Sequence, residues 1–329
     1  MKRFLIRRLV YMIFTVWFIT LVAFALIQLP PGDYVTHIIA EMMQQGADTF
    51  SPELQQQLRE QYGLDDPIYI QYYKWMRNII LHGDFGYSFT YKRDAVDLIV
   101  ERLPMTFVLT SASVLFIWAS ALPIGVFSAV KKYSMGDYFA TFLGFIGLAT
   151  PNFLLALILM YLSYRYGGHA LIGLFSKEYT DAPWSWGKVL DLGAHLIIPV
   201  IIIGTAGTAG LIRTMRANLL DELNRPYVDT ARAKGLPENY LLWKYPVRHA
   251  LNPFVSTIGW TLPYLVGGEV IVSIVLNLPT SGPVLFNALM DQDMYVAAGF
   301  ILVLSSLTVF GTFISDVLLV MLDPRIRLE

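Results

Sequence analysis

A single acidic residue, Glu269, lies within a long apolar stretch of this chain. A direct role in binding a substrate is the first explanation to consider for it. The run from about residue 254 to residue 278 contains no other charged residue. An ionised side chain in the middle of a membrane costs roughly 2.5–3.5 kcal/mol on insertion scales, so such a residue is a functional candidate by default. We expect Glu269 to face a cavity and to contact a cationic or hydroxyl-bearing group of a substrate. The alternative is a structural hydrogen bond to a neighbouring helix or to another subunit.

Polar residues in two other apolar stretches invite the same question. Asn152 directly follows Pro151, and a proline within a helix leaves a backbone carbonyl without its usual donor. We expect the Asn152 side chain to satisfy this backbone, with a substrate contact as the alternative. His195 opens another stretch, where we expect an interfacial hydrogen bond. Arg213 and Arg216 close that stretch, and we expect both to reach toward the membrane surface, with a position at the inner gate as the alternative.

The common catalytic motifs are missing from the sequence. The 329 residues contain no cysteine, which excludes disulfides, thiolate metal sites and cysteine nucleophiles. The sequence has no Gly-x4-Gly-Lys-Ser/Thr, His-Glu-x-x-His or Gly-x-Ser-x-Gly pattern, so Walker-type phosphate binding, zinc-protease and serine-hydrolase chemistry are not indicated. We therefore expect no enzyme activity, no metal and no cofactor in this chain. The net charge of -1 gives no indication of nucleic-acid binding.

Membrane-spanning helices are the elements that must position these residues. Hydrophobic residues make up 55% of the chain and charged residues 15%, whereas soluble domains carry about 25% charged residues. A hydrocarbon core of roughly 30 Å requires about 20 apolar residues in an α-helix. Six segments meet this requirement, so we predict an all-α integral membrane protein with six transmembrane helices. They run over residues 9–29, 104–130, 138–164, 194–213, 254–278 and 295–321.

The distribution of Lys and Arg predicts the orientation of the chain. Basic residues concentrate before the first segment and after the second, fourth and sixth segments. Because cytoplasmic loops are enriched in Lys and Arg, we place both termini in the cytoplasm. Three regions follow. Residues 1–29 form a cytoplasmic tip and an uncleaved first helix, residues 30–103 an extracytoplasmic insertion, and residues 104–329 the core with helices 2–6.

Helix signals within the insertion predict a small structured cap. Ser51 has the character of an N-cap, and Pro52 suits the first helical position. Leu54, Leu58 and Tyr62 follow at helical spacing before a glycine. We therefore expect a short helix on the extracytoplasmic side, between helices 1 and 2.

A cytoplasmic loop over residues 214–253 contains signals for two short helices. Pro226 favours a helix start and Gly235 a helix end, while Pro237 begins a second helix that ends near residue 246. A helix of about nine residues is too short to be stable alone in water, so it must dock. Exposed apolar patches mark partner sites, so we expect the two short helices of this loop to dock on a partner protein. The alternative is that the loop lies on the membrane surface or folds on the protein's own helices. The second short helix and the residue just before it carry more large apolar side chains than is usual for a cytoplasmic loop: Leu236, Tyr240, Leu241 and Trp243.

The residue order in this loop resembles the EAA loop of binding-protein-dependent ABC importer permeases. That loop begins Glu-Ala-Ala, with a glycine four residues after the second alanine. Here Asp229, Thr230 and Ala231 take the first three positions and Gly235 takes the glycine position. The resemblance implies coupling helices that sit in a groove of an ATPase subunit. The implied coupling residues are Tyr227, Val228, Asp229, Thr230, Ala231, Arg232, Ala233, Lys234, Gly235 and Leu236.

The likeness covers nearly the whole chain and is closest to the dipeptide/oligopeptide permease subfamily. Segments that resemble this subfamily occur in the expected order at residues 29–33, 62–67, 83–88, 195–199 and 322–327. The resemblance implies a type I ABC importer fold in the inner membrane of a prokaryote. It also implies a second homologous permease subunit, an extracytoplasmic solute-binding protein, and two ABC ATPase subunits that bind ATP and Mg. No cofactor is implied for this chain itself.

One helix departs from the family pattern. The family has a small residue after its paired glycines and a glutamate four positions later. Here Glu269 takes the small position and Ser273 the glutamate position, one helical turn apart and therefore on nearly the same face. Ser273 thus joins Glu269 and Asn152 as a candidate for the substrate path. Pro279-Thr280-Ser281-Gly282 replaces a glycine-rich turn, which leaves the construction of the external gate open.

Di- or oligopeptides are the first substrate class that the resemblance implies. Oligosaccharides, opines and nickel chelates are alternative cargoes of the same architecture. A secondary active transporter is the alternative from a different class, and it typically needs paired intramembrane acids or inverted repeats. The sequence shows one central acid and no evident repeat.

Overall fold

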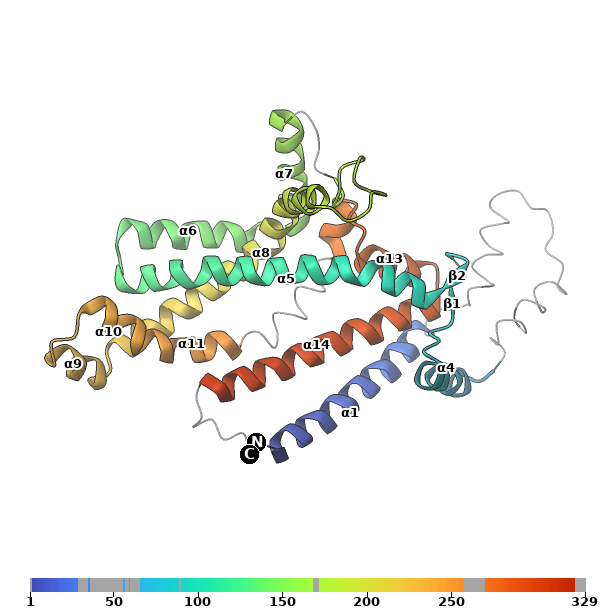
Figure 1. The fold of residues 1–329 in the computed structure, drawn as a ribbon, viewed down its shortest axis with the longest axis horizontal. Coiled ribbons are helices and arrows are strands. Elements are labelled where there is room, and N and C mark those ends of the chain that lie inside the picture. The colour runs from blue at the N-terminus through green and yellow to red at the C-terminus, as the bar shows by residue number, and fades with distance from the viewer. Residues whose placement is uncertain are drawn as a thin grey trace. The chain divides into compact units, whose positions relative to one another are not determined.

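The computed structural model describes residues 2–28, 35, 56, 59, 66–88, 90–167, 172–256 and 270–322. Within these residues the chain is helical apart from a two-stranded antiparallel sheet and short connections (Figure 1). The helices are α1 (Lys2–Ile27), α4 (Ile68–His82), α5 (Ala95–Val130), α6 (Met135–Ala149), α7 (Asn152–Gly167), α8 (Trp186–Leu223), α9 (Pro226–Ala233), α10 (Glu238–Lys244), α11 (Pro246–Ser256), α13 (Ser281–Met290) and α14 (Met294–Leu322). The strands are β1 (Tyr87–Ser88) and β2 (Arg93–Asp94).

Four of the described helices are long and apolar enough to cross a membrane: parts of α1 and α14, and all of α5 and α8. Helices α6 and α7 qualify as a pair, which brings the described part of the chain to as many as five spans. This agrees with an all-α membrane protein. The predicted segment 254–278 lies mostly outside the described residues, so the count of six spans stays a prediction. The predicted helix at residues 51–63 also lies outside them, apart from two isolated residues.

Residues 138–164 form two helices instead of the single helix that their hydropathy predicts. α6 ends at Ala149, α7 begins at Asn152, and the two axes are bent by 104°. Pro151 explains the break, because a proline disfavours helical geometry in the residue before it. Thr150 is accordingly extended, with φ -86° and ψ 119°.

Helix α8 extends beyond its apolar segment at both ends, since hydropathy reports contact with lipid and not helix length. Ser185 caps its N-terminus by accepting a hydrogen bond from the backbone N–H of Lys188. The Lys188 ammonium donates to the backbone carbonyl of Ala182 at 2.6 Å and lies 4.9 Å from the centre of the Phe175 ring. His195 donates from Nδ1 to the Asp191 carbonyl one turn earlier in the same helix, at 2.9 Å.

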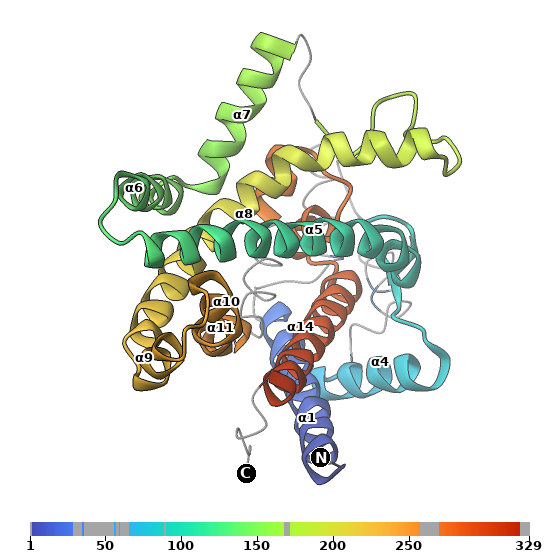
Figure 2. The same ribbon diagram turned by 60° about the vertical axis from the view of Figure 1, so that its left-hand side comes forward.

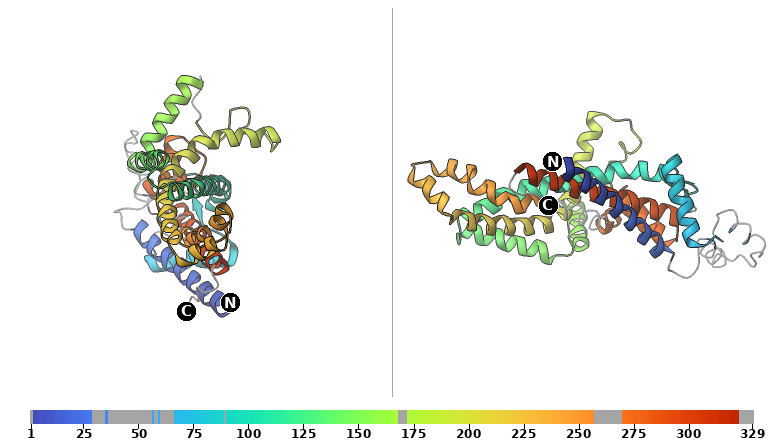
Figure 3. Two further views of the ribbon diagram at one scale, coloured as in Figure 1. Left: turned by 90° about the vertical axis from the view of Figure 1, so that its left-hand side faces the viewer. Right: turned by 90° about the horizontal axis from the view of Figure 1, so that it is seen from below.

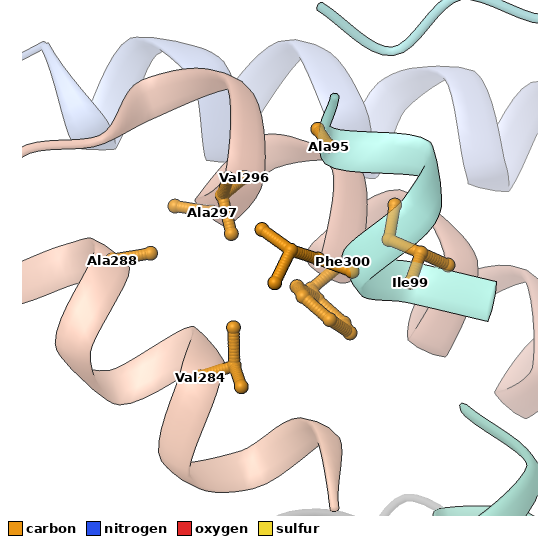
Figure 4. Close-up of a cluster of buried hydrophobic side chains, with 8 residues drawn as sticks. Ala95, Ile99, Val284, Ala288, Val296, Ala297 and Phe300 are labelled. Atoms are coloured by element: carbon orange, nitrogen blue, oxygen red, sulfur yellow. The ribbon is translucent and has the colours of Figure 1, made fainter. Parts of the chain in front are cut away.

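The described chain divides into two compact units. The first comprises Met1–Thr106 with Thr280–Val309, and its buried core joins the start of α5 to α13 and the start of α14 (Figure 4). Residues 279–294, which lie between the predicted fifth and sixth transmembrane segments, thus include the packed helix α13. The side chains of this core are Ala95, Leu98, Ile99, Val284, Ala288, Val296, Ala297 and Phe300.

The second unit comprises Phe107–Pro279 with Phe310–Glu329, and α8 is its central helix. α8 packs against α6, α7 and α11. Small residues permit this close approach: a Cβ at Gly147 of α6 would lie 2.5 Å from Cγ2 of Thr205 in α8. At the end of α8 the chain turns into α9 and α10, and α11 then runs back beside α8 (Figures 2 and 3).

Candidate functional site

The short helices that the sequence predicts after α8 are present with nearly the predicted ends. Pro226 occupies the first turn of α9, where a missing N–H costs nothing. The helix ends before Gly235, whose φ of +77° lies in the left-handed region that favours glycine. Its N–H donates to the carbonyl of Arg232 at 3.0 Å. α10 then starts directly after Pro237.

α9 and α10 fold against each other around a small core of their own. Val228, Ala231 and Leu241 are buried, and Tyr227, Leu236 and Tyr245 pack against them. We call Val228, Ala231 and Leu241 the α9–α10 core. Leu241 is fully buried, so the expectation that it contributes to an exposed patch is wrong. Some of the apolar side chains in this loop are therefore buried between α9 and α10 and are not available to a partner.

The outward surface of this helical pair combines polar and aromatic side chains. Asp229, Thr230 and Lys234 are exposed on and after α9. On α10, Tyr240 is 49% exposed and Trp243 is 53% exposed. The two aromatic residues are three positions apart, which places them on one side of the helix. The exposed part of the predicted apolar patch is therefore aromatic and is confined to α10.

An ion pair on the surface connects α9 with α10. Arg232 Nε donates to Glu238 Oε1 at 2.7 Å, and Arg232 NH1 lies 3.3 Å from Asp229 Oδ1. The hydrogen bond from Arg232 lowers the pKa of Glu238, and the same contact raises the pKa of Arg232. Because both side chains are solvated, the pair adds little to stability. Its geometric effect is to fix the turn between the two helices.

The junction between α8 and α9 is held by Tyr227. Its hydroxyl donates to Glu222 Oε2 at 2.5 Å, and its ring centre lies 5.6 Å from that of His249 in α11. Burial, followed by the neighbouring carboxylate, raises the pKa of Tyr227, which keeps the phenol protonated. The tyrosine therefore joins the end of α8, the start of α9 and the returning α11.

The candidate substrate-path residues are placed only in part. Glu269 lies outside the described residues. Ser273 is fully buried in the helical turn formed by residues 270–275. Asn152 is half-buried as the first residue of α7, where the Pro151 carbonyl accepts from the N–H groups of the following turn. Ser273 and Asn152 thus belong to separate elements. Within the described part of the chain, no cluster of three His, Asp or Glu residues could hold a metal.

Sequence reasoning missed a buried ion pair between α6 and α8. Arg216, expected to reach the membrane surface, donates from Nε and NH2 to the two carboxylate oxygens of Asp137, each at 2.9 Å. Asp137 lies in the first turn of α6 behind its N-cap, Ser134. The Ser-x-x-Asp spacing at residues 134–137 was the available sequence signal, because this pattern marks a helix start.

A second buried carboxylate was also missed. Asp293 is fully buried just before α14, and it accepts hydrogen bonds from the Ser88 hydroxyl at 2.7 Å and the Thr90 N–H at 3.1 Å. The Ser88 hydroxyl in turn accepts from the Tyr91 N–H at 3.0 Å. These bonds fasten the β1–β2 turn to the start of α14. The residues around Asp293 carry no sequence signal for a partner that lies 205 positions away.

Comparison with known proteins identifies the family. The chain matches the model of the binding-protein-dependent transport system inner membrane component over residues 121–328. It also matches the model of the N-terminal part of such membrane components over residues 1–110. Together these matches cover most of the chain and include the α9–α10 region.

Similar relatives extend over the full length of this chain. The oligopeptide transport system permease protein AppB of Bacillus subtilis (strain 168) is 38% identical over 329 residues, which cover 99% of this chain and 100% of the relative. The dipeptide transport system permease protein DppB of Escherichia coli (strain K12) is 31% identical, with 99% of both chains covered. The di/tripeptide transport system permease protein DppB of Pseudomonas aeruginosa (strain UCBPP-PA14) is 32% identical, again over 99% of each chain.

The resemblance seen in the sequence is therefore confirmed. The relatives are permease subunits and not enzymes, and the family is one of inner membrane components. Together with the apolar helices, this makes the chain a multi-pass permease of the inner membrane. The chain belongs to the family of binding-protein-dependent transport system inner membrane components.

Proposed function

We propose that this protein is the transmembrane permease subunit of an ATP-driven ABC importer that takes up di- or oligopeptides. The family match and the names of the full-length relatives support the transport class and the cargo. The structure of the α9–α10 pair supports a role in coupling the permease to an ATPase subunit. The pair is folded around its own core, is tied to α8, and presents Tyr240 and Trp243 outward.

The proposed assembly contains a second homologous permease, two ABC ATPase subunits and an extracytoplasmic solute-binding protein. In this assembly the chain has six spans in a type I importer fold, with both termini in the cytoplasm and residues 30–103 on the outside. The predicted segment 254–278 supplies the fifth span and brings Glu269 and Ser273 to the substrate path. Asn152, next to the break between α6 and α7, is the third candidate on that path.

The proposed mechanism uses α9 and α10 as a lever that does no chemistry itself. When ATP closes the ATPase dimer, the groove that holds residues 227–236 moves. The bond between Tyr227 and Glu222 and the packing of α11 on α8 carry this movement into the spanning helices. The helices then change from inward-open to outward-open, and the external protein delivers peptide to the shared cavity.

Site-directed cross-linking tests this proposal, because the chain has no cysteine of its own. A cysteine introduced at exposed Ala233 should form a cross-link to a co-expressed ABC ATPase subunit. A cysteine at Tyr69, which is 73% exposed on α4 and predicted to lie on the opposite side of the membrane, is the matched control and should form none.

Uptake by the purified assembly provides the second readout. Proteoliposomes that contain all subunits and the solute-binding protein should accumulate labelled dipeptide only when ATP is supplied. Uptake driven by a proton or sodium gradient, without an ATPase subunit, would show that the chain belongs to a secondary transporter.

A further inference from the structure

The buried ion pair between Asp137 and Arg216 lies where a movement of the coupling helices must enter the rest of the second unit. The Asp137 side chain is 3% exposed and that of Arg216 is 26% exposed. Both guanidinium contacts measure 2.9 Å, and the Tyr133 N–H adds a third bond to the carboxylate at 2.9 Å. Two parallel bonds from a planar guanidinium fix orientation as well as distance. The pair therefore restricts both sliding and rotation between α6 and α8.

The position of Arg216 connects this pair to the coupling helices. α8 continues as an uninterrupted helix from Arg216 to Leu223, and α9 begins at Pro226. At 1.5 Å per residue, the ion pair lies roughly 15 Å along the chain from the start of α9. A helix is stiff over that length, and Tyr227 holds α9 to the end of α8 through Glu222. A displacement of α9 consequently reaches Arg216 with little loss.

The other end of α6 is separated from α7 by a break in the helix. The pair holds the first turn of α6, whereas the helix ends at the 104° break before α7. Thr150 is extended there, and Pro151 has no N–H to continue the helix. Helix α6 is thus held to α8 in its first turn by the ion pair and near its last turn by the close contact of Gly147 with Thr205. The break therefore allows α6 to change direction relative to α7 and not relative to α8.

We propose that Asp137 and Arg216 are a positioning pair that transmits the displacement of α9 and α10 to α6, which pivots at the Thr150–Pro151 break. This inference deepens the proposed function and rests on it. The pair touches neither nucleotide nor substrate. It makes α6, α8 and α9 move as one body, so that ATP hydrolysis and transport stay coupled.

The first test compares hydrolysis with transport in the complete assembly. The variants Asp137→Asn and Arg216→Gln should retain the ATPase subunits and hydrolyse ATP, while the peptide transported per ATP falls by about tenfold, a size typical of coupling between sites. Arg216→Lys keeps the charge but loses the two-pronged contact and should give an intermediate ratio. Lys131→Gln removes an exposed charge from the neighbouring turn and should leave the ratio unchanged.

Distance measurements provide a readout that a merely structural role would not change. Spin labels on cysteines at Tyr138 of α6 and Ala233 of α9, both exposed, report the separation of the two helices. In the assembly with wild-type Asp137 and Arg216, the distance should be the same with and without ATP. With Arg216→Gln it should change when ATP binds. A constant distance in that variant, or normal transport per ATP, overturns the proposal.

A variant with one unpaired buried charge can fail to assemble, because losing one partner of such a pair is strongly destabilising. In that case Asp137→Leu combined with Arg216→Met removes both charges at similar volume. Assembly with ATP hydrolysis but poor transport supports the proposal, whereas full transport refutes it. These outcomes are distinct from failure of the proposed function, in which the unmodified chain itself would bind no ATPase subunit.

Discussion

The Ser88 hydroxyl donates a 2.7 Å hydrogen bond to the carboxylate of Asp293, and both side chains are fully buried. The two residues are 205 positions apart in the sequence. The carboxylate sits at the N-terminal end of α14 with its oxygens turned to the N–H groups of Thr90 and Val296. A negative charge is favourable at this end of a helix. One buried carboxyl group thus fixes the β1–β2 turn and the start of a long apolar helix together.

Removing the Ser88 hydroxyl should destabilise the first unit. Ser88→Ala deletes a buried hydrogen bond and leaves part of the Asp293 carboxyl group unsatisfied, so we expect a loss of about 1–3 kcal/mol. Thermal unfolding in detergent measures the change as a lower Tm. Tyr69→Phe, at a position 73% exposed, is the control and should leave the Tm unchanged. An unchanged Tm for Ser88→Ala would mean that the Asp293 contact adds nothing.

Substitutions in the α9–α10 core and on its surface should have different effects. Leu241→Ala opens a cavity in a fully buried position, and we expect a loss of about 2–5 kcal/mol in local stability. Hydrogen exchange of residues 226–245 should rise accordingly, and ATPase binding should fall with it.

Trp243→Ala should weaken ATPase binding while it leaves the helices intact. Exposed tryptophans at the centre of interfaces contribute about 2 kcal/mol or more, which corresponds to about 30-fold in affinity. Binding of the purified ATPase subunit to the permease in nanodiscs measures the change, with hydrogen exchange of α10 as the control. Unaltered affinity would place Trp243 outside the interface.

Gly235→Ala should strain the link between α9 and α10 through the backbone alone. Its φ is +77° and a Cβ there would meet nothing within 4 Å, so the whole cost, about 1–2 kcal/mol, is the left-handed conformation. Transport should decrease because the Arg232–Glu238 geometry shifts. Gly193→Ala is the matched control, since a Cβ is equally unhindered there but φ is not positive. Equal effects of the two variants would contradict this explanation.

The ion pair between Arg232 and Glu238 predicts a response of the α9–α10 turn to acid. Arg232 lowers the pKa of Glu238. A lowered pKa contributes stability that is present above the ordinary glutamate pKa and is lost as the pH falls through the lowered value. Hydrogen exchange in the turn, measured relative to the intrinsic exchange rate at each pH, should therefore be constant from pH 7 down to the ordinary glutamate pKa of 4.5. It should rise only in stronger acid. Glu238→Gln should abolish that rise, and high salt should reduce it.

The parts of this fold that could be predicted from sequence are those set by local signals. Pro226, Gly235 and Pro237 act on their own backbone, so α9 and α10 were found with nearly correct ends. Long apolar runs predicted most of α1, α5, α8 and α14, because hydropathy is also a property of the local sequence. The order of motifs along the chain also gave the family, which the comparisons confirm.

The features that could not be predicted depend on partners far along the chain. Nothing near Arg216 indicates that its partner is Asp137, which lies 79 residues away. Asp293 likewise looks like a loop acid until Ser88 is placed beside it. Leu241 was assigned to a surface because only the folded pair shows that α9 covers it. The predicted roles of Glu269, Ser273 and Asn152 stay predictions, since Glu269 lies outside the described residues and the other two belong to separate elements.

The α9–α10 core has a consequence for the speed and reversibility of the transport cycle. A segment that orders only on contact gives up about 2–5 kcal/mol or more of its gross interaction energy to that ordering. The proposed lever, whose two helices are already folded on their own core, avoids this loss at every encounter. A small interface with the ATPase subunit can therefore be stable enough. The helices can also dissociate and bind again in each transport cycle without refolding.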